Sequence, residues 1–147
     1  MAYVSNADIE LRLGTVVAVQ LTDDAGAGVI NAALMDEARS GAEGEVNSYL
    51  ARRFLTPIDV GEHAEVAGLL ASVTLDLVEY RLHARRPPIP PSVIQRHRSA
   101  LDWLGRVASG AVALPSAVAI ASPKSSGLVA GSAGEPVVFS RDDLDGL

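Results

Sequence analysis

The sequence predicts an all-α fold: a small bundle of about four helices, followed by a long extended C-terminal arm that carries a short β-strand. Hydrophobic residues make up 48% of the 147 residues but aromatic residues only 4%, and Ala, Val and Leu suit close-packed helices. These residues recur at helical spacing in three long segments. The last segment is instead rich in Gly, Ser and Pro. We therefore expect a helical body over residues 1–110 and an arm over residues 111–147.

The first part of the chain predicts one short helix and one ambiguous segment. Ser5 or Asn6 can N-cap a helix that ends before Gly14, with acidic residues in its first turn. Residues 15–21 are apolar and β-branched, which fits either a short strand or another helical turn. Residues 22–28 contain two aspartates and two glycines and should form a loop.

A long helix is expected from about Asn31 to Phe54, because apolar residues follow one stripe along it. The stripe consists of Leu34, Ala38, Ala42, Val46, Tyr49 or Leu50, and Phe54. Gly41 and Gly44 either weaken the middle of this helix or let another helix approach closely. Pro57 marks the exit from the helix.

The next helix, from about Glu62 to Arg85, is apolar on nearly all sides and should be central in the bundle. A proline-rich stretch over residues 87–91 then forms a stiff connector. Ser92 can cap a last helix that runs to about Ser109, with Gly110 at the position that favours glycine after a helix.

The charge is acidic overall but unevenly distributed. The formal net charge is −6, which argues against non-specific binding to nucleic acid. Residues 81–111 carry six arginines and a single acid, whereas the preceding 80 residues are strongly acidic. The basic segment is either a solvated face or a contact surface for an acidic partner.

No pattern of residues predicts catalysis, a cofactor or a metal. The chain has no cysteine, so disulfides, thiolate zinc sites and a cysteine nucleophile are excluded. The loop that begins at Asp23 is similar to an EF-hand loop but lacks the oxygen ligands that calcium needs. The three histidines lack metal-binding spacing. We expect a protein that is not an enzyme, without a signal peptide or a membrane span.

Arginines near two helix ends are the first candidates for a partner interface. Arg52 and Arg53 end one predicted helix, and Arg81, Arg85 and Arg86 end the next. One interpretation is that these cations complement the helix dipoles. The other is that their guanidinium groups bind the carboxylates of a partner.

The arm supplies the second candidate. Residues 111–134 are mostly small and cannot form a core, and such ends fray unless something holds them. The segment from Pro136 to Arg141 alternates enough to form a short strand, which would need the sheet edge of another protein. We therefore predict a spacer followed by a docking strand that includes Val137, Val138, Phe139 and Arg141.

Short motifs in this order resemble the head-to-tail adaptor family (connector or head-completion proteins) of Mu-like tailed phages. They are Tyr3 with Ala7-Asp8-Ile9, Gln20-Leu21-Thr22-Asp23, Asn47-Ser48-Tyr49-Leu50-Ala51-Arg52-Arg53-Phe54 with Pro57, Tyr80-Arg81-Leu82-His83, Ala100-Leu101-Asp102-Trp103-Leu104 with Gly110, and Phe139-Ser140-Arg141-Asp142-Asp143. The chain departs from the pattern twice. The glycine loop lacks acidic residues that relatives carry, and Asn47 stands where an aspartate is common.

The resemblance implies an all-helical adaptor that forms a dodecameric ring beneath the portal. Such a ring extends the DNA channel, lets DNA pass without specific binding, and presents a surface to the next neck or tail protein. The expected location is the neck of a virion assembled in the cytoplasm of a host bacterium. Two alternatives remain open: a small helical DNA-binding or regulatory module that uses the arginines of residues 81–106, and an enzyme accessory subunit.

Overall fold

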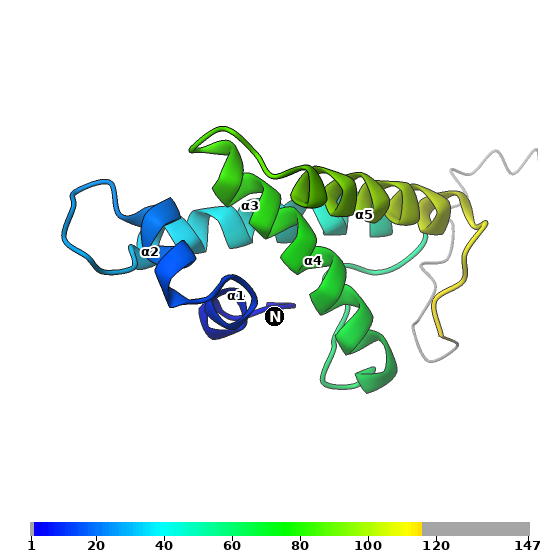
Figure 1. Ribbon diagram of the computed structural model, residues 1–147. Coiled ribbons are helices and arrows are strands. Elements are labelled where there is room, and N and C mark those ends of the chain that lie inside the picture. Colours follow the sequence, from blue (N-terminus) through cyan, green and yellow to red (C-terminus); the bar gives the residue numbers. More distant parts are fainter. Residues whose placement is uncertain (1, 116–147) are drawn as a thin grey trace, which may run out of the picture.

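The structure, a computed structural model, describes residues 2–115, and these residues form five helices (Figure 1). In chain order the helices are α1 (Asn6–Leu13), α2 (Thr15–Thr22), α3 (Ala32–Leu50), α4 (Ala64–Ala84) and α5 (Pro91–Ser109). The all-α prediction is thus confirmed for this part of the chain. The expected number of about four helices was too low by one, because residues 15–21 belong to a helix.

Packing decides the conformation of α2. Its buried residues are Ala18, Leu21 and Thr22, and this spacing of three and four residues places them on one helix face. The hydroxyl of Thr22 donates to the carbonyl of Ala18 and accepts the amide of Asn31, which connects α2 to the start of α3. β-branched residues alone left the strand and the helix equally plausible, and burial against α3 and α4 selects the helix.

The helix ends differ from the predicted ones in three places. Helix α3 ends at Leu50 rather than Phe54, although Phe54 is still buried after a short turn. Helix α4 begins at Ala64, two residues later than expected. Helix α5 begins at Pro91 and is not capped by Ser92, because a proline in the first turn needs no amide partner.

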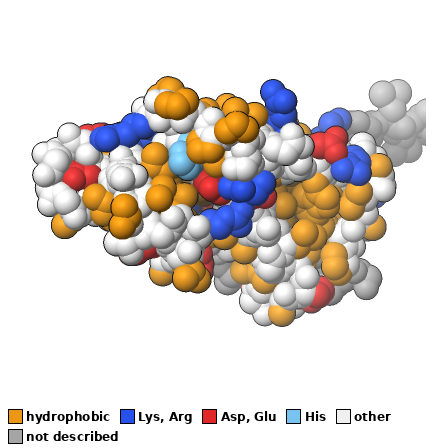
Figure 2. Space-filling model, viewed as in Figure 1, with side chains coloured by type: hydrophobic (Ala, Val, Ile, Leu, Met, Phe, Trp, Pro, Cys, Tyr) orange, Lys and Arg blue, Asp and Glu red, His pale blue; other side chains and the backbone are white. Residues whose placement is uncertain are grey.

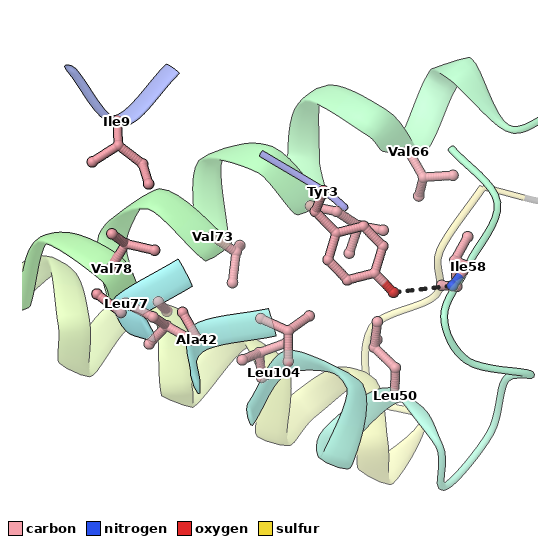
Figure 3. Close-up of a cluster of buried hydrophobic side chains, with 14 of the residues drawn as sticks. Tyr3, Ile9, Ala42, Leu50, Ile58, Val66, Val73, Leu77, Val78 and Leu104 are labelled. Atoms are coloured by element: carbon pink, nitrogen blue, oxygen red, sulfur yellow. Dashed lines mark hydrogen bonds between the residues drawn. The ribbon is translucent and has the colours of Figure 1, made fainter. Parts of the chain in front are cut away.

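Helix α4 is central in the bundle, as its apolar character predicted. It contacts each of the other four helices, and Figure 1 shows it crossing the molecule with the others around it. Its buried residues include Val66, Leu70, Val73 and Leu77, which pack against apolar side chains of α3 and α5 (Figure 3). The core thus forms around α4, and the remaining faces of the outer helices are available to solvent or to partners.

The N-terminal segment is anchored in this core by Tyr3, which is only 7% exposed. Its hydroxyl donates to Asn47 Oδ1 and accepts the amide of Ile58 at 3.0 Å (Figure 3). Its own amide donates to Glu43 Oε1 at 2.8 Å. Burial raises the pKa of the Tyr3 phenol, so this hydroxyl keeps its proton. Asn47, one of the two departures from the adaptor pattern, therefore holds the N-terminal segment against α3.

The chain still packs on the body after α5. Gly110 adopts a left-handed conformation with φ of 86°, as expected for a glycine after a helix. Leu114 is buried in the core, and Val112 is partly buried against it. The predicted docking strand with Val137, Val138, Phe139 and Arg141 lies outside the described residues, and the division at residue 110 stays a prediction.

Candidate functional site

Two of the predicted interface arginines hold the loop between α2 and α3. Arg85 donates to the carbonyl of Leu21 at 2.7 Å and to Asp24 Oδ2 at 2.6 Å. Arg86 donates to the carbonyl of Asp23 and to Asp24 Oδ1, each at 2.9 Å. Both guanidinium groups therefore share one carboxylate, and Arg86 followed by Arg85 lowers the pKa of Asp24.

The glycine loop is closed by its own backbone. Asp23 Oδ1 accepts the amide of Ala27 at 2.9 Å, and Oδ2 accepts the amide of Gly28 at 2.7 Å. These hydrogen bonds, with that of Gly28 the larger, lower the pKa of Asp23. Gly26 and Gly28 both have φ of 73°, a conformation that glycine adopts without strain. The carboxylate that sequence analysis weighed as a calcium ligand thus orders the turn.

Arg81 lies across α3 at a glycine. Its Nη2 is 2.9 Å from Glu45 Oε2, and a Cβ added to Gly41 would lie 2.8 Å from its Nη1. The absence of a side chain at Gly41 therefore makes room for a guanidinium group. Nothing lies within 4 Å of the corresponding position at Gly44. Of the two interpretations of these glycines, close approach holds at Gly41, although the approaching group is a side chain rather than a helix.

Arg52 and Arg53 lie in the turn after α3 and have different surroundings. Arg52 is exposed. The guanidinium group of Arg53 lies over Gly110, where an added Cβ would be 1.8 Å from Nη1. Arg53 therefore brings a positive charge to the C-terminal end of α5, where cations are favoured. From the sequence, Arg53 was expected at the end of its own helix. The sequence could not show that Arg53 also lies beside the end of α5.

A cluster of four charges connects three helices, and sequence analysis missed it. Arg12 of α1 contacts Asp76 at 2.6 Å and Glu79 at 3.5 Å on α4. Arg96 of α5 contacts Glu79 at 2.7 Å and Asp76 at 3.6 Å. Burial raises the pKa of Asp76, and the two arginines offset part of that rise. The sequence did contain one indication of this cluster: Asp76 and Glu79 lie three residues apart on a largely apolar helix.

These ion pairs remove most of the predicted basic surface. In residues 81–106, the arginines paired with acids of the same chain are Arg81, Arg85, Arg86, Arg96 and Arg106. Only Arg98 has no such pair among residues 2–115. DNA binding needs a basic face whose charges are free to meet phosphates. The arrangement therefore does not favour the DNA-binding alternative.

A groove of about 400 Å³ lies between α3, α4 and α5. It is lined by Leu34, Glu37, Ala38, Glu45, Tyr80, Arg81, Ala84, Arg85 and His97. The rings of Tyr80 and His97 stack with their centroids 3.8 Å apart. Partial burial lowers the pKa of His97, which keeps this ring neutral at pH 7. The groove therefore combines an aromatic and aliphatic lining with two acids and two arginines.

A second surface feature is the apolar outer face of α1 and α2. Leu11 is 85% exposed and Val16 is 71% exposed, and the sequence of α2 is apolar on all sides. A helix of this kind is normally covered by other protein. In Figure 2, hydrophobic side chains reach the surface at several places between the charged groups. The sequence pattern did not indicate this face, because residues 15–21 fit a strand as well as a helix.

Among residues 2–115, no three His, Cys, Asp or Glu side chains form a group that could hold a metal ion. No helix in this part of the chain is long and apolar enough to cross a membrane.

The model of the protein family described as Bacteriophage Mu, Gp36 matches residues 3–131, which is most of the chain. The chain belongs to the Bacteriophage Mu Gp36 family. No curated protein matches it. The resemblance to a protein family of Mu-like phages is thus confirmed, and the described body of this Gp36 family member is a five-helix bundle with ion-paired arginines and an uncovered apolar face.

Proposed function

We propose that this Gp36 family member is a structural virion protein of the phage neck. As a head-to-tail adaptor it forms a ring beneath the portal, extends the DNA channel, and offers a docking surface to the next neck or tail protein. The exposed apolar face of α1 and α2 carries the proposal, because Leu11 and Val16 have the exposure of residues that assembly would cover. Membership of a Mu phage family gives this assembly its context.

Opposite sides of α3 have different surroundings within the subunit. Asp36, Glu43 and Asn47 bind the N-terminal segment and α1 on one face of α3. The groove residues Leu34 and Ala38 lie roughly 160° around the helix from that face, at 100° per residue. A subunit with different surfaces on opposite sides can contact its neighbours head to tail, which closes into a ring when the rotation permits.

Charge supports a channel that does not retain DNA. The net charge of −6 repels phosphate, and five arginines of residues 81–106 form ion pairs within the chain. DNA that must move through a ring is retained less when most basic side chains are already paired with acids. We therefore assign no specific DNA contact to the described body.

The arm is the second element of the proposal. It reaches a neighbouring subunit, the portal or a tail protein through Val137, Val138 and Phe139. Residues 2–115 contain helices but no strand, so they offer no sheet edge. Strand addition would therefore use an edge of the portal or of a tail protein.

The ring is tested by measuring the mass of the full-length protein alone and mixed with the portal protein. The double variant Leu11→Glu, Val16→Glu should remain folded but fail to join the ring, because charge would enter a buried apolar contact. Gln20→Glu is the matched control, since it adds a charge to an exposed polar position of α2 and should assemble normally. Assembly of the double variant as complete as that of the unmodified protein would contradict the proposed interface.

The arm is tested by truncation after Pro115. A truncation after Gly110 would also remove Leu114, which is part of the core, and would confuse loss of the arm with loss of stability. The truncated protein should keep the helix content of the body but fail to join portal and tail. Infectious particles assembled with it would show that the arm is dispensable.

A further inference from the structure

The groove between α3, α4 and α5 has an unusual combination of features that points to a peptide ligand. Its lining joins the Tyr80 and His97 rings with the aliphatic side chains of Leu34, Ala38 and Ala84. Charged groups surround this apolar lining. A groove of about 400 Å³ accommodates a few side chains rather than a whole helix.

The charges at the groove are not all satisfied. Glu37 is exposed and has no ion pair among residues 2–115. Arg85 and Arg86 share the single carboxylate of Asp24, so one of these two positive charges lacks an acid of its own. A matching peptide would therefore present apolar residues together with one base and at least one acid.

The arm of the same chain contains such a sequence. Val137-Val138-Phe139 is its apolar cluster, Arg141 is the only arginine after Arg106, and Asp142-Asp143 follow at once. The apolar residues match the groove lining, Arg141 matches Glu37, and the two aspartates match the arginines at the end of α4. The signs of the charges in these seven residues are thus complementary to those at the groove.

The length of the spacer fits the distance that it would have to cross. The described residues end at Pro115, next to the C-terminal end of α5, and His97 in the groove is about 18 Å back along that helix. The 21 residues from Ser116 to Pro136 separate the described body from Val137, and a random coil of that many residues has a root-mean-square length of about 25 Å. Intramolecular binding is strongest when linker length and span agree.

We propose that the groove is the docking site for Val137–Asp143 of the chain's own arm in the free subunit. The inference rests on the proposed function for the identity of the arm as a docking segment, and it states where that segment is held before a partner takes it. The same apolar residues would otherwise be exposed in solution, where they favour premature association.

Cysteine cross-linking tests the site directly, because the full-length chain has no cysteine of its own. The double variant Ala84→Cys, Val138→Cys places one thiol at the exposed groove residue Ala84 and one in the arm. Under mild oxidation the free subunit should form an intrachain disulfide, visible as a faster-migrating monomer on a non-reducing gel. The matched control is Ser72→Cys with Val138→Cys, because Ser72 is exposed on α4 but outside the groove.

The groove pair should react about tenfold faster than the control pair, as expected from a high effective concentration at the docking site. Equal rates would overturn the proposal. The proposal would also be overturned if the double variant formed no intrachain disulfide while a mixture of the two single-cysteine variants formed disulfides between chains. Both measurements use the subunit without portal, so they are independent of whether a ring forms.

A charge exchange provides the second test. Glu37→Arg and Arg141→Glu should each slow disulfide formation in the groove pair, and the two together should restore the rate. Glu37 is exposed, so its replacement leaves the core intact. If the combined variant is no faster than the single ones, Arg141 does not face Glu37 and the proposed register is wrong.

Discussion

Removal of one hydroxyl, in Tyr3→Phe, should destabilise the fold measurably, because this group joins two distant parts of the chain. The hydroxyl donates to Asn47 Oδ1 on α3 and accepts the amide of Ile58 in the connection to α4. Phenylalanine keeps the ring and its packing, so only these two hydrogen bonds are lost.

The expected loss follows from the burial of the two partners. Ile58 is buried, and an unsatisfied buried amide costs about 1–3 kcal/mol. Asn47 is half-buried and can find water, so its bond contributes about 0.5 kcal/mol. We therefore expect a decrease of about 2 kcal/mol in the free energy of unfolding, or a fall in Tm of about 4–8 °C for a chain of this size.

Urea unfolding followed by circular dichroism at low protein concentration measures this loss. Tyr49→Phe is the matched control, because Tyr49 is half-buried in α3 and its hydroxyl has no hydrogen-bond partner among residues 2–115. The control should change the stability by less than about 0.5 kcal/mol. If the two variants are equally stable, Tyr3 does not link α3 to Ile58 in solution.

Three further predictions concern other parts of the body. Gly110→Ala should lower the free energy of unfolding by about 1 kcal/mol, because alanine is strained at φ of 86°. Gly105→Ala should raise it by up to about 1 kcal/mol, because nothing lies near an added Cβ at this position of α5. Thermal melts check both variants, and shifts of Tm in the same direction would contradict this difference. Ile9→Ala should lower the free energy of unfolding in urea by about 2–5 kcal/mol, whereas Leu11→Ala should change that of the monomer by less than about 0.5 kcal/mol. An equal loss in both variants would show that Leu11 is covered within the subunit. The pKa of Asp23 is lowered in the folded protein, so its contribution to stability is complete above the ordinary value of 3.8 and is lost as the pH falls through the lowered pKa. The NMR shifts of the loop amides should therefore titrate with a midpoint below 3.8, and Asp23→Asn should abolish that titration.

The sequence predicted the parts of the fold that depend on periodicity over many residues. The three long helices and the central position of α4 follow from apolar spacing over 19 to 21 residues. Helix α2 has only eight residues and no polar face, so its pattern could not distinguish helix from strand. Its conformation depends on burial against α3 and α4, which is information about distant residues. The start of α5 at Pro91 was missed because the whole proline run over residues 87–91 was assigned to the connector and Ser92 to the helix cap.

The candidate surfaces were predictable in composition but not in pairing. Arg81, Arg85 and Arg86 lie at the end of α4 as expected, yet their partners are 36 to 64 residues away along the chain. Sequence spacing indicates which charges share a helix face, whereas it cannot indicate which charges meet across helices. The same limit concealed the contact of Arg53 with Gly110 and the cluster around Asp76 and Glu79.

That cluster determines which parts of the subunit can change position. Arg12, Asp76, Glu79 and Arg96 join α1, α4 and α5, and separation of α1 or α5 would leave two largely buried carboxylates with a single arginine between them. The cluster therefore opposes separation of these three helices. The loop after α2 is attached to α4 through exposed contacts to Asp24, which solvent can replace. We expect any adjustment of the subunit to its neighbours to be concentrated in that loop, because its ion pairs with Asp24 are exposed and water can replace them.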